Sequence, residues 1–193
     1  MIPDPLGMDV SPDGKHVAYT SQGTLFLARI PGGEKEREVP LDGGEGANVV
    51  FSPNGKRLAV SCLPRLEIRS AVDLQMVVRV PSLPRRVWDV VAFSPDGQTL
   101  ASSGYHEVYR WDSRTWTLRD TLIGHPSNVR SLFFSHRGDL IASAGGKTII
   151  VWNPSTGRPR WKRDFPRNVS PIAFSPDGRW LATGTTRGSV EGL

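Results

Sequence analysis

The chain has 193 residues and a formal net charge of +5, and 38% of its residues are hydrophobic and 22% charged. This composition is ordinary for a folded globular protein and argues against intrinsic disorder. No apolar run approaches the roughly 20 residues that span a bilayer, and the single cysteine, Cys62, excludes an internal disulfide. Met1 is not followed by the basic segment and apolar segment of a secretory signal peptide, so we expect a cytoplasmic protein with no membrane association.

A five-residue signal recurs along the chain, with its clearest copy, Phe-Ser-Pro-Asp-Gly, at 93–97. Five copies at a spacing of about 41 residues indicate a repeat architecture. The serines of the five copies are Ser11, Ser52, Ser94, Ser135 and Ser175.

The residues of this signal predict a tight turn. Pro95 presets φ, Asp96 can hydrogen-bond to the nearby backbone, and Gly97 supplies a positive φ without steric cost. Apolar, β-prone residues precede the turn at 90–93 and resume at 99–101. Each copy therefore predicts a β-hairpin, and five evenly spaced hairpins predict an all-β fold.

Four strands are expected in each complete repeat, and no sustained apolar stripe at helical spacing predicts a helix. In the first two repeats the predicted strands are 6–11, 16–21, 24–30 and 36–41, then 47–52, 57–62, 66–71 and 76–80. In the next two they are 88–94, 99–104, 108–112 and 117–123, then 129–135, 140–144, 148–153 and 160–164. The fifth repeat offers 169–175 and 180–185.

The third and fourth repeats carry two further motifs. Tyr-Arg-Trp-Asp at 109–112 ends a predicted third strand, Val-Trp-Asn at 151–153 is its near copy, and Gly124-His125 precedes an innermost strand. In these residues the chain resembles the WD-repeat β-propeller family. The resemblance implies a single propeller domain of four-stranded antiparallel blades over residues 1–193. The expected blades are 5–42, 47–82, 87–124 and 129–165, with a partial blade at 169–193.

The resemblance also implies a structural network. In the family a His, a Ser or Thr, an Asp and the Trp are hydrogen bonded within a blade. The turn Gly145-Gly146-Lys147 lacks the expected Asp, and the first two repeats keep only the turn and the apolar pattern. We therefore expect most blades to be held by apolar packing. The matching residues are His125, Ser143 and Trp152 in the fourth repeat and Ser102, Trp111 and Asp112 in the third.

About four and a half blades do not close a ring in the family's usual way. We therefore expect an open or incomplete propeller whose unfinished blade edges favour self-association. A piece of a larger ring and closure by two chains are the alternatives.

The chain has no common catalytic motif. It contains no His-Glu-x-x-His, no Gly-x-Ser-x-Gly, no phosphate-binding loop and no cysteine pair. We expect no enzymatic activity, no metal and no cofactor. The alternative, a propeller enzyme of the metal-dependent hydrolase or lactonase type, would need several inward acidic residues, and the innermost strands supply only Asp9 and Asp89.

Family resemblance implies partner binding on the face where loops enter the innermost strands, so we expect a scaffold that binds a protein or peptide there. A Trp beside arginines is typical of interface hot spots, and the arginines favour an acidic peptide. The candidate partner-binding residues are Arg85, Arg86, Trp88, Asp89, Asn128, Arg130, Arg167 and Asn168.

Positive charge is concentrated after residue 50, because residues 1–50 hold four Lys and Arg against eight Asp and Glu. Such asymmetry is typical of proteins with an acidic partner or with nucleic acid. Solvated outer strands in an arginine-rich protein explain it more simply, so nucleic-acid binding is the weaker alternative. A steep salt dependence of binding would be its mark.

Overall fold

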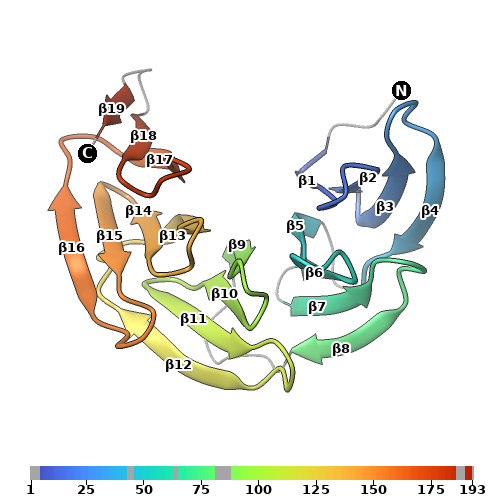
Figure 1. Ribbon diagram of the computed structural model, residues 1–193, viewed down its shortest axis with the longest axis horizontal. Helices are drawn as coiled ribbons and strands as arrows, with labels where there is room; N and C mark the ends of the chain where they lie inside the picture. The colour runs from blue at the N-terminus through green and yellow to red at the C-terminus, as the bar shows by residue number, and fades with distance from the viewer. Residues whose placement is uncertain (1–4, 43–45, 63–64, 81–87, 186–189, 193) are drawn as a thin grey trace. The chain divides into compact units, whose positions relative to one another are not determined.

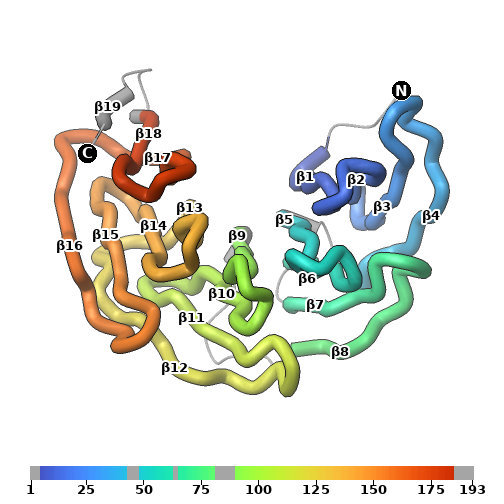
Figure 2. Tube along the Cα trace, in the orientation of Figure 1, coloured from blue at the N-terminus to red at the C-terminus, as the bar shows by residue number. Residues whose placement is uncertain are grey.

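A computed structural model describes residues 5–42, 46–62, 65–80, 88–185 and 190–192 of the protein. Throughout these ranges the regular elements are strands, which form five antiparallel sheets, numbered 1 to 5 here in chain order (Figures 1 and 2). The predicted all-β fold of four-stranded antiparallel sheets is confirmed.

The strand boundaries follow the predicted repeats closely. Sheet 1 contains β1 (Gly7–Val10), β2 (His16–Ser21), β3 (Thr24–Arg29) and β4 (Lys35–Pro40). Sheet 2 contains β5 (Gly46–Phe51), β6 (Arg57–Cys62), β7 (Arg65–Ser70) and β8 (Met76–Val80). Sheet 3 contains β9 (Trp88–Phe93), β10 (Thr99–Ser103), β11 (Glu107–Asp112) and β12 (Leu118–Ile123). Sheet 4 contains β13 (Val129–Phe134), β14 (Ile141–Gly145), β15 (Thr148–Trp152) and β16 (Pro159–Asp164). Sheet 5 contains β17 (Val169–Phe174), β18 (Leu181–Thr185) and β19 (Val190–Gly192).

Consecutive strands are neighbours in every sheet, so each sheet is a simple meander. Burial follows strand position, as sheet 4 shows: β14 and β15 are buried along their whole length, whereas β16 is almost entirely exposed. The two central strands of a sheet therefore carry its apolar packing, and the fourth strand faces solvent.

The chain forms two compact units, residues 1–93 and 94–193. In the first unit β5 packs against β1 and β2, and β9 packs against β5 and β6. In the second unit β13 packs against β10, and β17 packs against β13 and β14. Apolar side chains such as Leu25 and Val60 fill the first core, and Ile149 and Ile172 belong to the second.

The recurring five-residue signal forms the turn between the first and second strands of each sheet. In sheet 3 the Ser94 hydroxyl donates to Asp96 Oδ1 at 2.5 Å and accepts the Thr99 amide at 2.9 Å. Gly97 has a φ of 67°, and its amide donates to the Ser94 carbonyl oxygen at 2.8 Å. The motif therefore specifies a local turn.

Sheet 5 is incomplete in the described part of the chain. It contains the two predicted strands and a short third strand, β19, which pairs with β18 only over Ala182 to Gly184. The other four sheets have four strands each.

Candidate protein-interaction face

The loops that lead into β13 and β17 contain Asn128, Arg167 and Asn168, three of the predicted partner-binding residues, and a fourth, Arg130, is the second residue of β13. Arg130, Arg167 and Asn168 are exposed, and Asn128 is half-buried. The turn between β14 and β15 lies beside these loops and adds the exposed Lys147. We call Asn128, Arg130, Lys147, Arg167 and Asn168 the basic loop face.

Backbone hydrogen bonds hold the loops of this face together. The Phe165 amide donates to the Lys147 carbonyl oxygen at 2.8 Å, and the Val169 amide donates to the Gly146 carbonyl oxygen at 2.9 Å. Between the innermost strands, the Ile172 amide donates to Ser131 Oγ at 3.2 Å. The side chains of sheets 4 and 5 on this face therefore project from a rigid support.

The basic loop face has little nearby negative charge. Segments 124–135 and 165–175 contain no Asp or Glu, and the turn acids of these sheets, Asp139 and Asp177, lie at the opposite end of the strands. Asp164 precedes one loop, but its carboxylate accepts the Thr148 hydroxyl at 2.6 Å. The charge on this face is therefore mainly positive.

The remaining partner-binding predictions fall on another loop. Arg85 and Arg86, together with the side chains of Trp88 and Asp89, lie outside the described residues. Their part in partner binding stays a prediction.

In sheet 4 three of the predicted network residues are hydrogen bonded to one another. His125 Nε2 lies 2.7 Å from Ser143 Oγ, and Trp152 Nε1 donates to the same oxygen at 2.8 Å. His125 and Trp152 are only 5% and 1% exposed. The network thus ties the loop before β13 to the middle of the sheet.

The other nitrogen of His125, Nδ1, is buried and has no hydrogen-bond partner among the described residues. Burial, followed by the positive charge of Lys162 and by His106, lowers the pKa of His125 from its ordinary value of 6.5 to about 4. The imidazole is therefore neutral at neutral pH.

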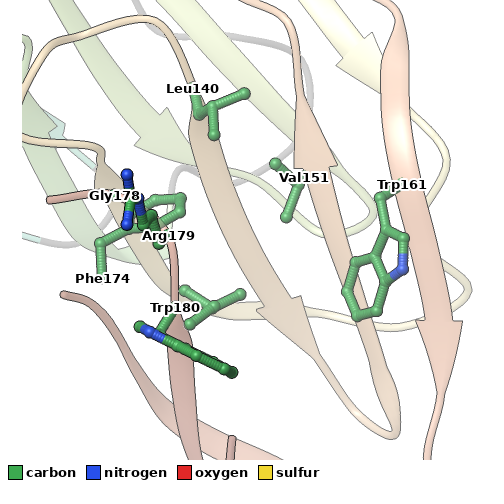
Figure 3. A pocket seen from close by; sticks show the side chains of 8 residues that line it. Leu140, Val151, Trp161, Phe174, Gly178, Arg179 and Trp180 are labelled. Atoms are coloured by element: carbon green, nitrogen blue, oxygen red, sulfur yellow. The ribbon is translucent and has the colours of Figure 1, made fainter. Parts of the chain in front are cut away.

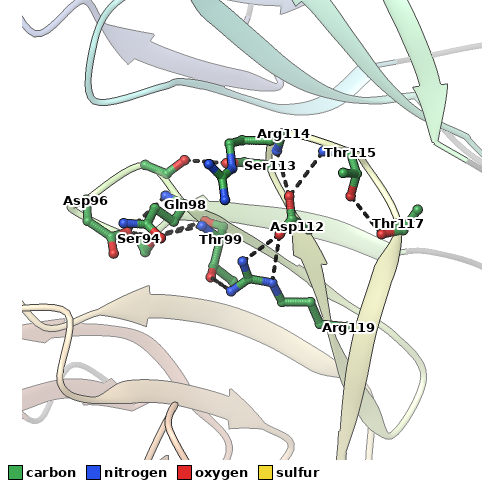
Figure 4. A network of polar contacts seen from close by, with 11 residues as sticks. Ser94, Asp96, Gln98, Thr99, Asp112, Ser113, Arg114, Thr115, Thr117 and Arg119 are labelled. Atoms are coloured by element: carbon green, nitrogen blue, oxygen red, sulfur yellow. Dashed lines mark hydrogen bonds and ion pairs between the residues drawn. The ribbon is translucent and has the colours of Figure 1, made fainter.

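In sheet 3 the corresponding pair is also formed, since Trp111 Nε1 donates to Ser102 Oγ at 2.9 Å. Asp112 lies outside this pair. Its carboxylate accepts Arg119 Nη2 at 2.6 Å and the Arg114 amide at 2.9 Å, in the turn that leads to β12 (Figure 4). The arginine side chain and the turn amides hold the pKa of Asp112 well below its usual range.

Sheet 2 holds a buried ion-pair network where the sequence predicts apolar packing. Arg69 pairs with Leu58, as Trp152 pairs with Ile141 in sheet 4, so an arginine occupies the tryptophan position. Its Nη2 and Nε donate to Glu67 Oε2 at 2.7 and 3.0 Å.

Both members of this pair are withdrawn from solvent. Glu67 is fully buried, and Arg69 is 5% exposed. Arg79 Nη2 donates to the second carboxylate oxygen of Glu67 at 3.2 Å, and Arg69 Nη1 donates to the Leu74 carbonyl oxygen at 2.9 Å. The only sequence signal for this buried ion pair was an acid and a base two residues apart among the apolar residues of 65–70.

Gly145 supports the basic loop face through its lack of a side chain. A Cβ atom at this position would lie 2.7 Å from the Asn128 carbonyl oxygen and 2.9 Å from that of Ser127. We expect Gly145→Ala to displace the loop before β13 and to lower the free energy of unfolding by about 1–3 kcal/mol. Urea unfolding measures this loss. Gly184→Ala is the matched control, because its Cβ would meet nothing closer than 3.4 Å, and equal losses in the two variants would contradict the prediction.

The described side chains show no arrangement suited to metal catalysis. Among them, no group of three or more His, Cys, Asp or Glu residues is placed to hold a metal ion. Cys62 is buried, and burial raises the pKa of its thiol to about 12. None of the described residues belongs to a helix that is long and apolar enough to cross a membrane.

Comparison with known proteins identifies the family to which the repeats are similar. The family model for the WD domain, G-beta repeat, matches residues 80–112, 116–153 and 168–190. These segments cover most of sheets 3 and 4 and much of sheet 5.

Similar curated proteins include a WD repeat-containing protein and a small ribosomal subunit protein. The chain is 31% identical over 117 residues to the periodic tryptophan protein 2 homolog of Schizosaccharomyces pombe, a match that covers 58% of this chain and 14% of that protein. It is 30% identical over 139 residues to an uncharacterized WD repeat-containing protein of Synechocystis, covering 69% of this chain and 39% of that protein. It is 33% identical over 100 residues to the small ribosomal subunit protein RACK1y of rice, covering 49% of this chain and 30% of that protein.

The chain thus spans well under half of the length of these relatives. The three matched repeats, the recurring four-stranded antiparallel sheets and these relatives together show that the chain belongs to the WD-repeat β-propeller family.

Proposed function

We propose that this chain is a non-catalytic scaffold that binds a protein or peptide through the basic loop face. The observation that carries the proposal is the placement of the exposed Arg130, Lys147 and Arg167 at one end of sheets 4 and 5, where the adjoining Asp164 carboxylate accepts the Thr148 hydroxyl. WD-repeat relatives of this chain include a ribosomal subunit protein, which supports a role in a protein assembly.

Charge defines the partner that fits this face. Three exposed cations beside two amide side chains favour a segment rich in Asp or Glu, because complementary charge speeds association and selects among partners. The amides of Asn128 and Asn168 can donate to carboxylate or backbone oxygens at the same time. An acidic protein segment is therefore the proposed ligand.

Charge reversal tests the proposal. We expect the double variant Arg130→Glu and Arg167→Glu to lose its partners in affinity capture from a lysate, quantified by mass spectrometry, without loss of thermal stability. The double variant Arg114→Glu and Arg137→Glu is the matched control, because its two arginines are equally exposed at the opposite end of the strands.

Two outcomes would count against the proposal. Capture of the same proteins by both double variants would remove the basic loop face as the site. Capture that disappears after nuclease treatment would show that the cations bind nucleic acid instead.

A further inference from the structure

The fourth strand of sheet 4 concentrates positive charge. β16, orange in Figure 1, is the outermost strand of its sheet. The segment 158–164 holds four exposed cations against one acid, Asp164. We call the four cations, Arg158, Arg160, Lys162 and Arg163, the outer cation strip.

No cation of this strip forms an ion pair with an acid among the residues that the structure describes. Lys162 Nζ donates to the carbonyl oxygen of Gly124 at 3.1 Å, which leaves its charge uncompensated. The Arg163 guanidinium lies 5.1 Å from the centre of the Phe165 ring, a contact that also leaves its charge in place. The strip therefore keeps its full charge for a partner.

The fourth strands of sheets 1, 2 and 3 treat their charges differently. Lys35 in β4, Arg79 in β8 and Arg119 in β12 each form an ion pair with an acid of the same sheet. β4 as a whole balances two cations with two acids. Solvation of an ordinary outer strand therefore does not account for the strip, because outer strands elsewhere in this chain neutralise their charge.

The strand geometry spreads the charge over both faces of an edge. β16 has six residues, so at about 3.3 Å per residue it is about 20 Å long. Trp161 pairs with Val151 and Arg163 pairs with Ile149, so Trp161 and Arg163 share one face, and Lys162 points to the other. An extended anionic polymer can follow such an edge.

An aromatic side chain lies among the cations. Trp161 is half-buried, and together with Val151 and Trp180 it lines an apolar groove of about 200 Å³ (Figure 3). Unpaired bases stack on exposed indole surface, while neighbouring guanidinium groups bind phosphate. Carboxylates of an acidic peptide would use only the charges, so the combination favours a single-stranded nucleic acid.

We propose that the outer cation strip binds the phosphate backbone of a single-stranded nucleic acid, with a base stacked on Trp161. Three of the four cations are arginines, whose planar guanidinium donates two parallel hydrogen bonds to a phosphate group. Backbone contacts and stacking do not read base edges, so binding has little sequence preference. The strip shares no residue with the basic loop face and takes a different ligand.

Fluorescence polarisation of a labelled oligouridine of about 20 nucleotides, titrated with the full chain, tests the proposal. Each phosphate neutralised on a single strand contributes about 0.7 to the slope of log K against log salt concentration, so four cations predict a slope of about −3. We expect saturable binding with this salt dependence. An oligothymidine of the same length identifies the preferred sugar, and binding of either oligonucleotide supports the proposal.

Neutral variants locate the binding. Arg160→Gln combined with Arg163→Gln removes two contacts, so we expect affinity to fall about tenfold or more and the slope to shrink by about 1.4. Arg114→Gln combined with Arg137→Gln is the matched control, because it removes the same charge from exposed arginines outside the strip. The control should keep the wild-type affinity and slope.

Three results would overturn the proposal: no saturable binding, equal weakening in both double variants, or equal competition from polyglutamate of the same charge. The last result would assign the strip to an acidic protein segment. Arg130→Gln combined with Arg167→Gln separates the strip from the basic loop face and should still bind the oligonucleotide. Loss of binding in that variant alone would place the nucleic acid on the basic loop face and remove it from the strip.

Discussion

Replacing Glu67 with alanine is expected to lower the free energy of unfolding by about 3–5 kcal/mol. The substitution leaves the Arg69 guanidinium 5% exposed, with only the Leu74 carbonyl oxygen as a remaining partner. A buried cation without its counter-ion keeps its desolvation cost and loses the attraction that offset it. Urea unfolding followed by tryptophan fluorescence measures the loss.

A double-mutant cycle separates the ion pair from its setting. Glu67→Met and Arg69→Met together replace both charges by apolar groups of similar length, so we expect the double variant to recover most of the stability that either single variant loses. Glu38→Ala is the control, because its ion pair with Lys35 is about half exposed on both sides and is worth roughly 1 kcal/mol or less. Losses in the two single variants that simply add in the double variant would contradict a coupled buried pair.

The turns of this fold are predictable from sequence because their chemistry is local. A serine that bonds a nearby carboxylate and a glycine with positive φ specify the turn within five residues. The fourth copy has His136 and Arg137 in place of Pro and Asp, but its serine still donates a hydrogen bond to a nearby carboxylate. There the Ser135 hydroxyl donates to Asp139 Oδ1 at 2.7 Å. Strand positions follow from the turns, because each strand begins or ends at one.

Burial of charge is not predictable in the same way. Glu67 and Arg69 alternate with apolar residues in β7, a pattern that is typical of a strand with one solvated face. Residues 66–69 of β7 are all buried, so both faces of the strand are covered, and the two charges compensate each other within the sheet. That compensation depends on tertiary packing, which local sequence does not encode.

The candidate binding site also combines residues that are predictable from sequence with residues that only the structure reveals. Arg130 and Arg167 were predicted because they lie at or just before the start of innermost strands, whose ends follow from the turns. Lys147 was missed as a binding residue, since only the backbone bonds from Phe165 and Val169 to the β14–β15 turn reveal that it adjoins them. The apolar groove lined by Val151, Trp161 and Trp180 (Figure 3) was also missed, because it depends on the register that places Trp161 beside Val151.

Acidification is expected to destabilise the protein through His125. In the unfolded chain a histidine has a pKa near 6.5, whereas burial and the charge of Lys162 lower the pKa of His125 in the folded state to about 4. The unfolded state therefore binds more protons between these values, so stability is full above about pH 6.5 and is lost as the pH falls toward 4. The shift corresponds to a loss of about 3 kcal/mol.

The comparison that isolates this effect uses His125→Gln, which can still reach Ser143 but does not titrate. The free energy of unfolding of the wild type, measured in urea from pH 7.5 to 4.5, should fall relative to that of His125→Gln by most of this amount. His136→Gln, at an exposed turn position, is the matched histidine replacement and should keep the wild-type dependence on pH. Parallel curves for the wild type and His125→Gln would contradict the prediction, because they would show that the pKa of His125 is the same in the folded and unfolded states.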